Sequence, residues 1–314
     1  MARPLRIEYP GAVYHVTARG NGGQAIFADA ADAARLLALI GREAGQMGWR
    51  VHGYCLMENH YHLLVETPEP NLGRGMGRLN MCYAQDFARR HARPGHLFQG
   101  RYRAVLVEKP RWLAPLCRHV VLNPVRCGLV RRADQWKWSS LALLDAPPAG
   151  DAVPVWVERD WLRTQFGGTE GWRNYVTAGA DAVAPWESLR GGQYLGGEAF
   201  LKDCAARLEG RDLAQVSRAA ARPDRPDTAA VREAVARAAG LAADAPLRRR
   251  GNPPAFDATV YLLRRAADLK LAEVAALGGI SPARVSQIQR DVEDAGGLAA
   301  AFPWGDRLEA LMRR

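Results

Sequence analysis

The sequence of 314 residues has no run that approaches the roughly 18 apolar residues of a membrane span. Its start, Met1 to Pro10, lacks the apolar core of a secretion signal. The five cysteines form no CxxC pair, which argues against paired-thiol zinc and redox motifs, and we expect reduced, mostly buried thiols. No internal repeat is evident. We therefore expect a cytoplasmic protein without a membrane partner.

Acidic residues are scarce in the first half of the chain. Residues 1–145 hold 20 Lys/Arg and 11 Asp/Glu, whereas the remainder holds 23 and 22, so the net charge of +10 is concentrated at the front. A basic surface attracts polyanions because each neutralised phosphate releases a counterion. The charge distribution favours a nucleic acid as partner and the first half as the functional part.

The length predicts two or three domains rather than one. A Pro/Gly-rich stretch separates the basic half from the rest, and helical patterns dominate after it. We predict a first domain, a linker, a small helical segment, a polar and helical connector and a C-terminal domain at residues 1–145, 146–154, 155–207, 208–249 and 250–314.

Hydrophobic periodicity predicts the order of elements in the first domain. Alternating β-branched and aromatic residues indicate strands, and apolar residues at helical spacing indicate the helices between them. The order β-α-β-β-α-β-α is typical of an α+β domain in which an antiparallel sheet carries helices on one face. The predicted strands are 12–18, 49–57, 60–67 and 101–108, and the predicted helices are 29–47, 72–90 and 112–122.

Two histidines stand two residues apart on the third predicted strand. Side chains alternate along a strand, so His60 and His62 should point to the same face, while Tyr61 and its neighbours at alternate positions face the opposite layer. Two imidazoles at this spacing can converge on one metal ion. A pair of histidines that is simply hydrogen-bonded at the edge of a core is the structural alternative.

A later helix offers a third polar group. His119 and Asn123 are four residues apart, so they share one face of a helix. Two imidazoles and an amide oxygen suit a moderately hard ion such as magnesium or manganese, which would polarise a scissile phosphate. Asn123 precedes Pro124, and closing the helix is its alternative role.

Four blocks in this order resemble the IS200-type transposases, and more closely their REP-associated tyrosine transposase branch. The resemblance covers about residues 1–145 and implies a ferredoxin-like HUH fold, binding of imperfect single-stranded DNA hairpins, and nicking and rejoining through a phosphotyrosine link. It places His60 and His62 at the metal ligands and Asn123 at the third ligand. It also favours a monomer over a dimer. The blocks are 54–66, 95–102, 118–126 and 136–140.

The family's tyrosine nucleophile is missing. It stands four residues before the helix-borne ligand, where this sequence has His119. A histidine there could coordinate the metal, could accept the phosphoryl group itself, or could leave the site without strand cleavage. Tyr83 on the preceding predicted helix is an alternative nucleophile, although its spacing is also that of a core aromatic.

Basic side chains near aromatic residues are candidates for DNA contact, because single-stranded bases stack on aromatic rings. Each one alone is also consistent with an ordinary solvated charge. The candidates are Arg19, Asn21, Arg74, Arg78, Arg89, Arg90, Arg101, Arg103 and Arg126.

The C-terminal region has the spacing of a helix-turn-helix. Residues 250–295 resemble the DNA-binding domain of the chromosomal replication initiator, with Ser281 capping the second helix and Pro282 in its first turn. A plain helical bundle is the alternative. If the resemblance holds, duplex DNA would be contacted by Ser281, Arg284, Gln287 and Arg290.

These observations leave two principal hypotheses. The first is a metal-dependent hairpin endonuclease of the transposase class. The second is a silenced relative that is retained as a DNA-binding or regulatory protein, and His119 is the feature that favours it. A histidine-triad nucleotide hydrolase would need another histidine where Leu64 stands.

Overall fold

The computed structural model describes residues 6–143, 156–158, 160–180, 182–210, 216, 218–242, 245 and 251–312. The chain divides into two compact units, Met1–Ala220 and Ala221–Arg314. The boundary between these units falls inside the expected connector, and the expected linker at 146–154 lies outside the described residues.

The first unit is built on a five-stranded sheet in the order β2-β3-β1-β4-β5. Each neighbouring pair among the first four strands of this order is antiparallel, and β5 alone runs parallel to its neighbour β4. The α+β class predicted from the sequence is confirmed, and the sheet is mixed because of β5. The strands are β1 Ala12–Arg19, β2 Arg50–Met57, β3 His60–Thr67, β4 Arg103–Val107 and β5 Tyr194–Leu195.

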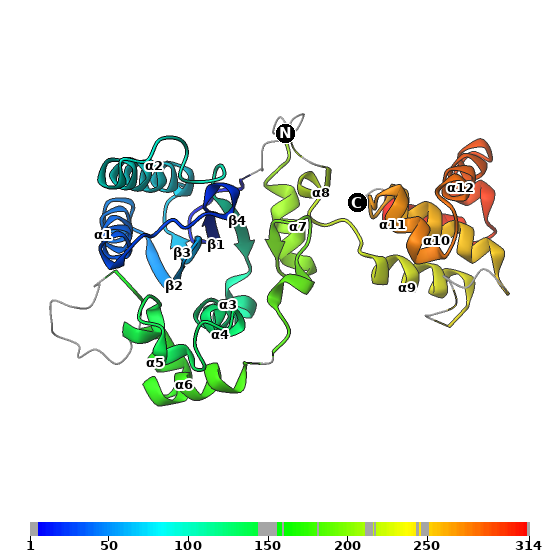
Figure 1. The fold of residues 1–314 in the computed structure, drawn as a ribbon. Helices are drawn as coiled ribbons and strands as arrows, with labels where there is room; N and C mark the ends of the chain where they lie inside the picture. The colour runs from blue at the N-terminus through cyan, green and yellow to red at the C-terminus, as the bar shows by residue number, and fades with distance from the viewer. Residues whose placement is uncertain are drawn as a thin grey trace. The chain divides into compact units, whose positions relative to one another are not determined.

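Helices cover both faces of this sheet, whereas the sequence led us to expect them on one (Figure 1). On one face lie α1, Ala30–Met47, and α2, Leu72–His91. The opposite face packs against α3, Lys109–Val121, followed by the short α4, Asn123–Arg126. The third helix moves to the second face because Leu113 and Leu116 of α3 bury against that side of the sheet.

The alternation of side chains along the strands creates the two cores. Tyr14 and Val16 of β1 pack toward α1 and α2, whereas Val13 packs toward α3 together with Leu64 of β3. All four side chains are at most 2% exposed. Polar residues that share the register of Val13 and Leu64 therefore face α3, and this determines where the histidines lie.

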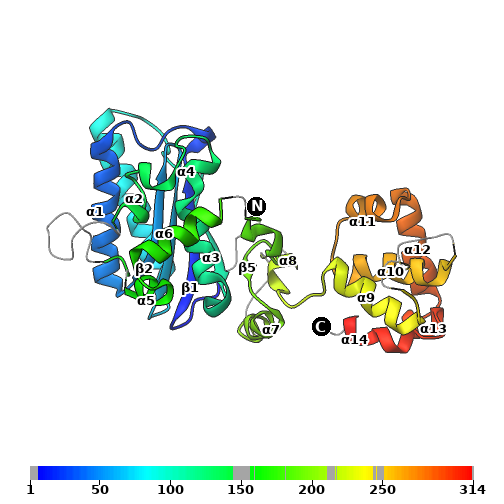
Figure 2. The same cartoon turned by 90° about the horizontal axis from the view of Figure 1, so that it is seen from below.

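Further helices follow the sheet. In the first unit, α5, Asp160–Phe166, and α6, Thr169–Ala178, pack on the α3 side (Figure 2), and α7 spans Glu198–Ala206. The described part of the second unit is entirely helical and has its own core. Its longer helices are α9 Thr228–Ala239, α10 Pro253–Arg265, α11 Leu271–Gly278 and α12 Pro282–Asp294.

Candidate functional site: a histidine cluster on the sheet

His60 and His62 share the α3 face of the sheet, as alternation along β3 predicts. Their Nε2 atoms are 3.1 Å apart. The neighbouring strand β1 adds His15, whose Nε2 lies 3.0 Å from Nδ1 of His62. His119 of α3 also lies close enough to lower the pKa of both His15 and His62. Four of the seven histidines of the chain are therefore in this cluster.

The hydrogen bonds around these rings run in one direction. The amide nitrogen of Asn59 donates to the carbonyl of Gly23, so its Oδ1 accepts from Nδ1–H of His60 at 2.7 Å. Nε2 of His60 is then the unprotonated nitrogen and accepts from His62 Nε2–H. Nδ1 of His62 in turn accepts from Nε2–H of His15. Every ring nitrogen between Asn59 and His15 has a matching partner.

These imidazoles are held neutral. Burial lowers the pKa of His15 to about 3, with further lowering by His119 and Arg103. Burial, and then His15, His60 and His119, hold the pKa of His62 well below its usual value. The pKa of His60 is also lowered, by burial and by Arg19. A neutral imidazole is the form that coordinates metal ions.

His119 is enclosed by two donors. Trp186 Nε1–H donates to its Nε2 at 3.1 Å, and the guanidinium of Arg126 lies against its Nδ1. Burial and the charge of Arg126 lower the pKa of His119 to about 4. A neutral imidazole accepts at only one nitrogen, so Trp186 and Arg126 compete for this ring. A buried, uncharged ring between two donors is poorly placed to attack a phosphate.

Trp186 packs against two rings of the histidine cluster. It belongs to a short helical turn, η4 Pro185–Ser188, and its ring centroid lies 4.8 Å from that of His15 and 5.0 Å from that of His119. Beside it is a cavity of about 350 Å³ whose lining includes His15, His62 and Arg103. The cavity combines imidazole, indole and guanidinium groups, a chemistry suited to an anionic ligand with flat rings.

Residues 9–113 match the family described as "Transposase IS200 like". This segment of the chain is therefore similar to the IS200-like transposases. The match ends before His119 and before the segment that carries Trp186.

The solved structures that are similar to the chain include one that is bound to DNA. It is described as "Structure of the REP associates tyrosine transposase bound to a REP hairpin", with 17% identity and a TM-score of 0.40, and the similarity covers 51% of this chain and 98% of that chain. No curated protein matches the sequence. None of the helices within the described residues is long and apolar enough to span a membrane.

Asn123 does not join the histidine cluster. Its amide nitrogen donates to the carbonyls of His119 and Val120 at 2.9 and 3.2 Å. This closes α3, which is the structural alternative recognised in the sequence. Within the described part of the chain, no contact links Asn123 to His60 or His62, and no group of three His, Cys, Asp or Glu side chains is arranged to hold a metal ion.

Tyr83 lies on the other side of the sheet from the histidines. It is 1% exposed in the core formed with α1 and α2, and its hydroxyl donates to the carbonyl of Ile26 at 2.6 Å. Burial raises its pKa further above the ordinary value. The structure therefore does not bring this candidate nucleophile to the site.

The candidate DNA contacts separate into two groups. Arg19 is paired in register with His60, Arg103 lines the cavity, and Arg126 contacts His119, so these lie at the site. Asn21 starts the short helix η1 Asn21–Gly23, and Arg101 lies just before β4; both residues are exposed. The other group is on α2, which covers the opposite face, and comprises Arg74, Arg78, Arg89 and Arg90.

Two arginines on α2 have structural partners. Arg78 pairs at 2.6 Å with the fully buried Glu43 of α1. Arg90 pairs at 2.5 Å with both Asp29 and Asp32 at the start of α1. These ion pairs join α1 to α2, so their guanidinium groups are already neutralised within the fold.

Sequence reasoning missed His15 and Trp186. His15 lies on a predicted strand, and its face was readable from alternation, but its pairing with His62 depends on the register between β1 and β3. Trp186 comes from a segment about 65 residues beyond the end of α3, and no local pattern connects it to the histidines.

In the second unit, the residues predicted to read duplex DNA lie along α12. The Ser281 hydroxyl accepts from the backbone N–H of Arg284 at 3.2 Å, which is the predicted cap. The Arg284 guanidinium lies 3.7 Å from Asp257, while Gln287 donates to Asp291 and accepts from Arg290. The helix-turn-helix assignment stays a prediction.

Proposed function

We propose that this protein binds single-stranded DNA hairpins through its transposase domain and has lost strand transfer through a tyrosine link. The observation that carries the proposal is His119, which stands at the position of the family nucleophile and is buried between Trp186 and Arg126. The imidazole of His119 does not provide the phenolate oxygen with which the family tyrosine attacks the phosphate. The histidine pair on β3 is retained, and it can hold an ion that binds a DNA phosphate.

The histidine pair fits a hydrated divalent ion. Two donor atoms 3.1 Å apart, each about 2.1 Å from a shared ion, subtend nearly a right angle at that ion, as octahedral coordination requires. Asn59 accepts from the outer nitrogen of His60. Metal binding at Nε2 of His62 would move the proton of His62 to Nδ1, where it would be donated to Nε2 of His15, as outer partners of metal ligands accept from them. With Asn123 engaged elsewhere, water and phosphate oxygens would complete the coordination of magnesium or manganese.

In this proposal each residue has a simple role. His60 and His62 hold the ion, which when bound polarises a phosphate oxygen of the DNA. Arg19 and Arg103 supply positive charge beside it, and Arg126 supplies charge from α4. Such contacts attract the backbone without reading its sequence.

Cleavage of a labelled hairpin tests this proposal. The hairpin carries a single-stranded flank and is incubated with the protein and manganese, and we expect tight binding with neither nicked nor protein-linked DNA. A His119→Tyr variant is expected to gain covalently linked product, because the phenol would stand at the family position. Adding His60→Ala to that variant should remove the product.

A strand-cleaving enzyme without the tyrosine is the second candidate. The convergence of the two Nε2 atoms on β3 favours it, because a metal site alone can support hydrolysis by water. Nicked DNA from the parent protein, lost on His60→Ala and free of any protein–DNA adduct, would establish this candidate and exclude the silenced one.

His15 is expected to position His62. Removing an outer partner of a metal-ligating histidine commonly costs about 10- to 100-fold in metal affinity. We expect His15→Ala to weaken manganese binding by about this factor in calorimetry and His15→Gln to recover part of it. Equal affinity in parent and His15→Ala would show that the contact at 3.0 Å has no orienting role.

The second unit would add duplex binding if α11 and α12 form a helix-turn-helix. Gly279 ends α11 in the left-handed region with φ +60°, and Ser281 starts α12, which is the short turn such a motif uses. The charge balance of this half is near neutral, so contacts by Arg284 and Arg290 would supplement the hairpin site rather than replace it.

A further inference from the structure

A second cavity lies beside the C-terminal end of α3, the helix that carries His119. It has a volume of about 410 Å³ and is enclosed by the α3–α4 turn, the segment around the short helix η2 Ala133–Gln135, and α6. Its floor is apolar and is formed by Leu122, Leu141 and Val176, each at most 3% exposed. This volume is within the range of small-ligand pockets, about 300–1,000 Å³.

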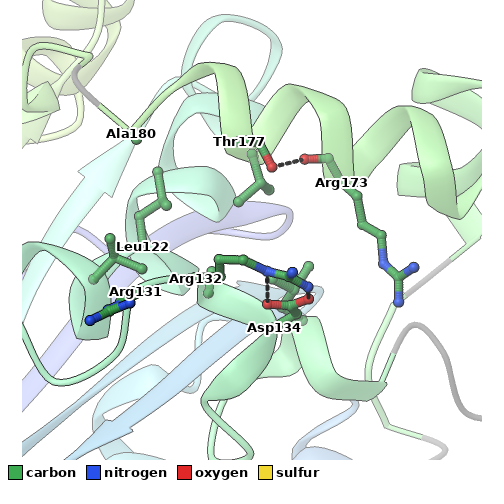
Figure 3. Close-up of a pocket in the computed structure, with 11 residues that line it drawn as sticks. Leu122, Arg131, Arg132, Asp134, Arg173, Thr177 and Ala180 are labelled. Atoms are coloured by element: carbon green, nitrogen blue, oxygen red, sulfur yellow. Dashed lines mark hydrogen bonds and ion pairs between the residues drawn. The ribbon is translucent and has the colours of Figure 1, made fainter.

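The rim of this cavity is basic. Figure 3 shows Arg132 and Asp134 on one side, with Arg173 and Thr177 of α6 on the other. Arg131 adds a third exposed guanidinium. Hydrogen bonds from Arg132 lower the pKa of the Asp134 carboxyl, which is the one acidic group among the described lining residues. The described lining residues thus include three arginines and one aspartate around an apolar floor.

The cavity is connected to the histidine cluster through α4. Val125 lines the cavity, and the next residue, Arg126, contacts His119 and donates to the carbonyl of Ala182 at 3.2 Å. Ala180 stands on the rim, a few residues before Trp186. The same two short segments therefore border both sites, so a DNA strand with one phosphate at the histidines would pass close to the cavity.

We infer that this cavity receives one unpaired nucleotide of the bound DNA, with the base on the apolar floor and the flanking phosphates at Arg131 and Arg173. The inference rests on the proposed function and adds to it an anchor for the single-stranded flank. An apolar floor favours a flat base, and the arginine rim favours the two phosphates beside it. All of the described lining residues lie beyond residues 9–113, the segment matched by the family.

An abasic scan tests the inference on the full chain. The probe is a fluorescent DNA hairpin with a flank of about ten nucleotides, in which each flank base is removed in turn. We expect one or two neighbouring positions to weaken binding by about tenfold in anisotropy titrations, since base–protein stacking has about this effect. Thr177→Trp adds bulk at the exposed rim. It should weaken binding of the intact probe about tenfold, and the affinity should then no longer depend on which flank base is removed.

Charge variants provide the second arm. In the double variant Arg131→Ala with Arg173→Ala, the slope of log affinity against log salt concentration should become shallower. The change should correspond to the loss of about one phosphate contact or more. Arg163→Ala on α5, outside the lining residues, is the matched control and should change neither the scan nor the salt slope. Thermal unfolding checks that each variant folds.

The outcomes separate the two proposals. Tight binding of the hairpin with a flat scan in the parent, and no effect of Thr177→Trp, would overturn the nucleotide pocket and leave hairpin binding intact. No binding of any hairpin by the parent protein would overturn the proposed function, and the pocket inference with it.

Discussion

Changing His62 to alanine is expected to weaken manganese binding by more than about a hundredfold, because a ligand is lost rather than an outer partner. His62 has one nitrogen toward His60 and the other toward His15, so it is the central ring of the cluster. The measurement is calorimetric titration of the metal-free protein with manganese, which reports the ion directly and does not depend on any DNA reaction.

His91→Ala is the matched control for this titration. His91 is on α2, where its ring contacts Asp32 at 2.9 Å, on the face of the sheet away from the cluster. The control variant should bind manganese like the parent. If His62→Ala also retains parental affinity, the pair on β3 is not the metal site and the proposed role of the ion is wrong.

The second large effect concerns stability. Glu66 of β3 is 6% exposed, and its carboxylate bonds His52 at 2.8 Å and Lys109 at 2.7 Å, with Arg50 3.9 Å away. The hydrogen bond from His52, together with Lys109, outweighs burial and lowers the pKa of Glu66 to about 2. Relative to an ordinary pKa near 4.5, this corresponds to about 3 kcal/mol of stability at neutral pH.

Glu66→Gln should therefore lower the free energy of unfolding at pH 7 by about 3 kcal/mol, measured by urea denaturation. A lowered carboxyl pKa stabilises the fold above pH 4.5 and loses this contribution as the pH falls towards 2. The difference between parent and variant should shrink over that interval. Asp203, which is 51% exposed, pairs with Arg207 on the surface. Asp203→Asn should therefore lower the free energy of unfolding by less than about 1 kcal/mol. A similar loss in both variants would contradict the special role of Glu66.

The strands and helices of the sheet domain were predictable because their patterns are local. β3 is found at His60–Thr67 as predicted, and α1 begins directly after its cap, Asp29. The face on which α3 packs was not predictable from spacing. It depends on which face of the sheet Leu113 and Leu116 pack against, and α1 and α2 cover the first face.

The same distinction applies to the site. The common orientation of His60 and His62 follows from the period of a strand. The position of Asn123 was assigned from the family pattern, whereas its amide is engaged by the end of its own helix. His15 and Trp186 reach the cluster through strand register and a distant segment, and such long-range pairings leave no periodic signal in the sequence.

The pairing of β5 with β4 has a consequence for how this domain can be isolated. The backbone N–H groups of Leu106 and Glu108 donate to the carbonyls of Gln193 and Leu195, so the outer edge of β4 is covered by chain that follows the family segment by some 80 residues. A fragment cut at the end of that segment would present β4 as a bare edge, open to pairing with another copy. A fragment in which β5 still covers this edge must therefore extend at least through Leu195.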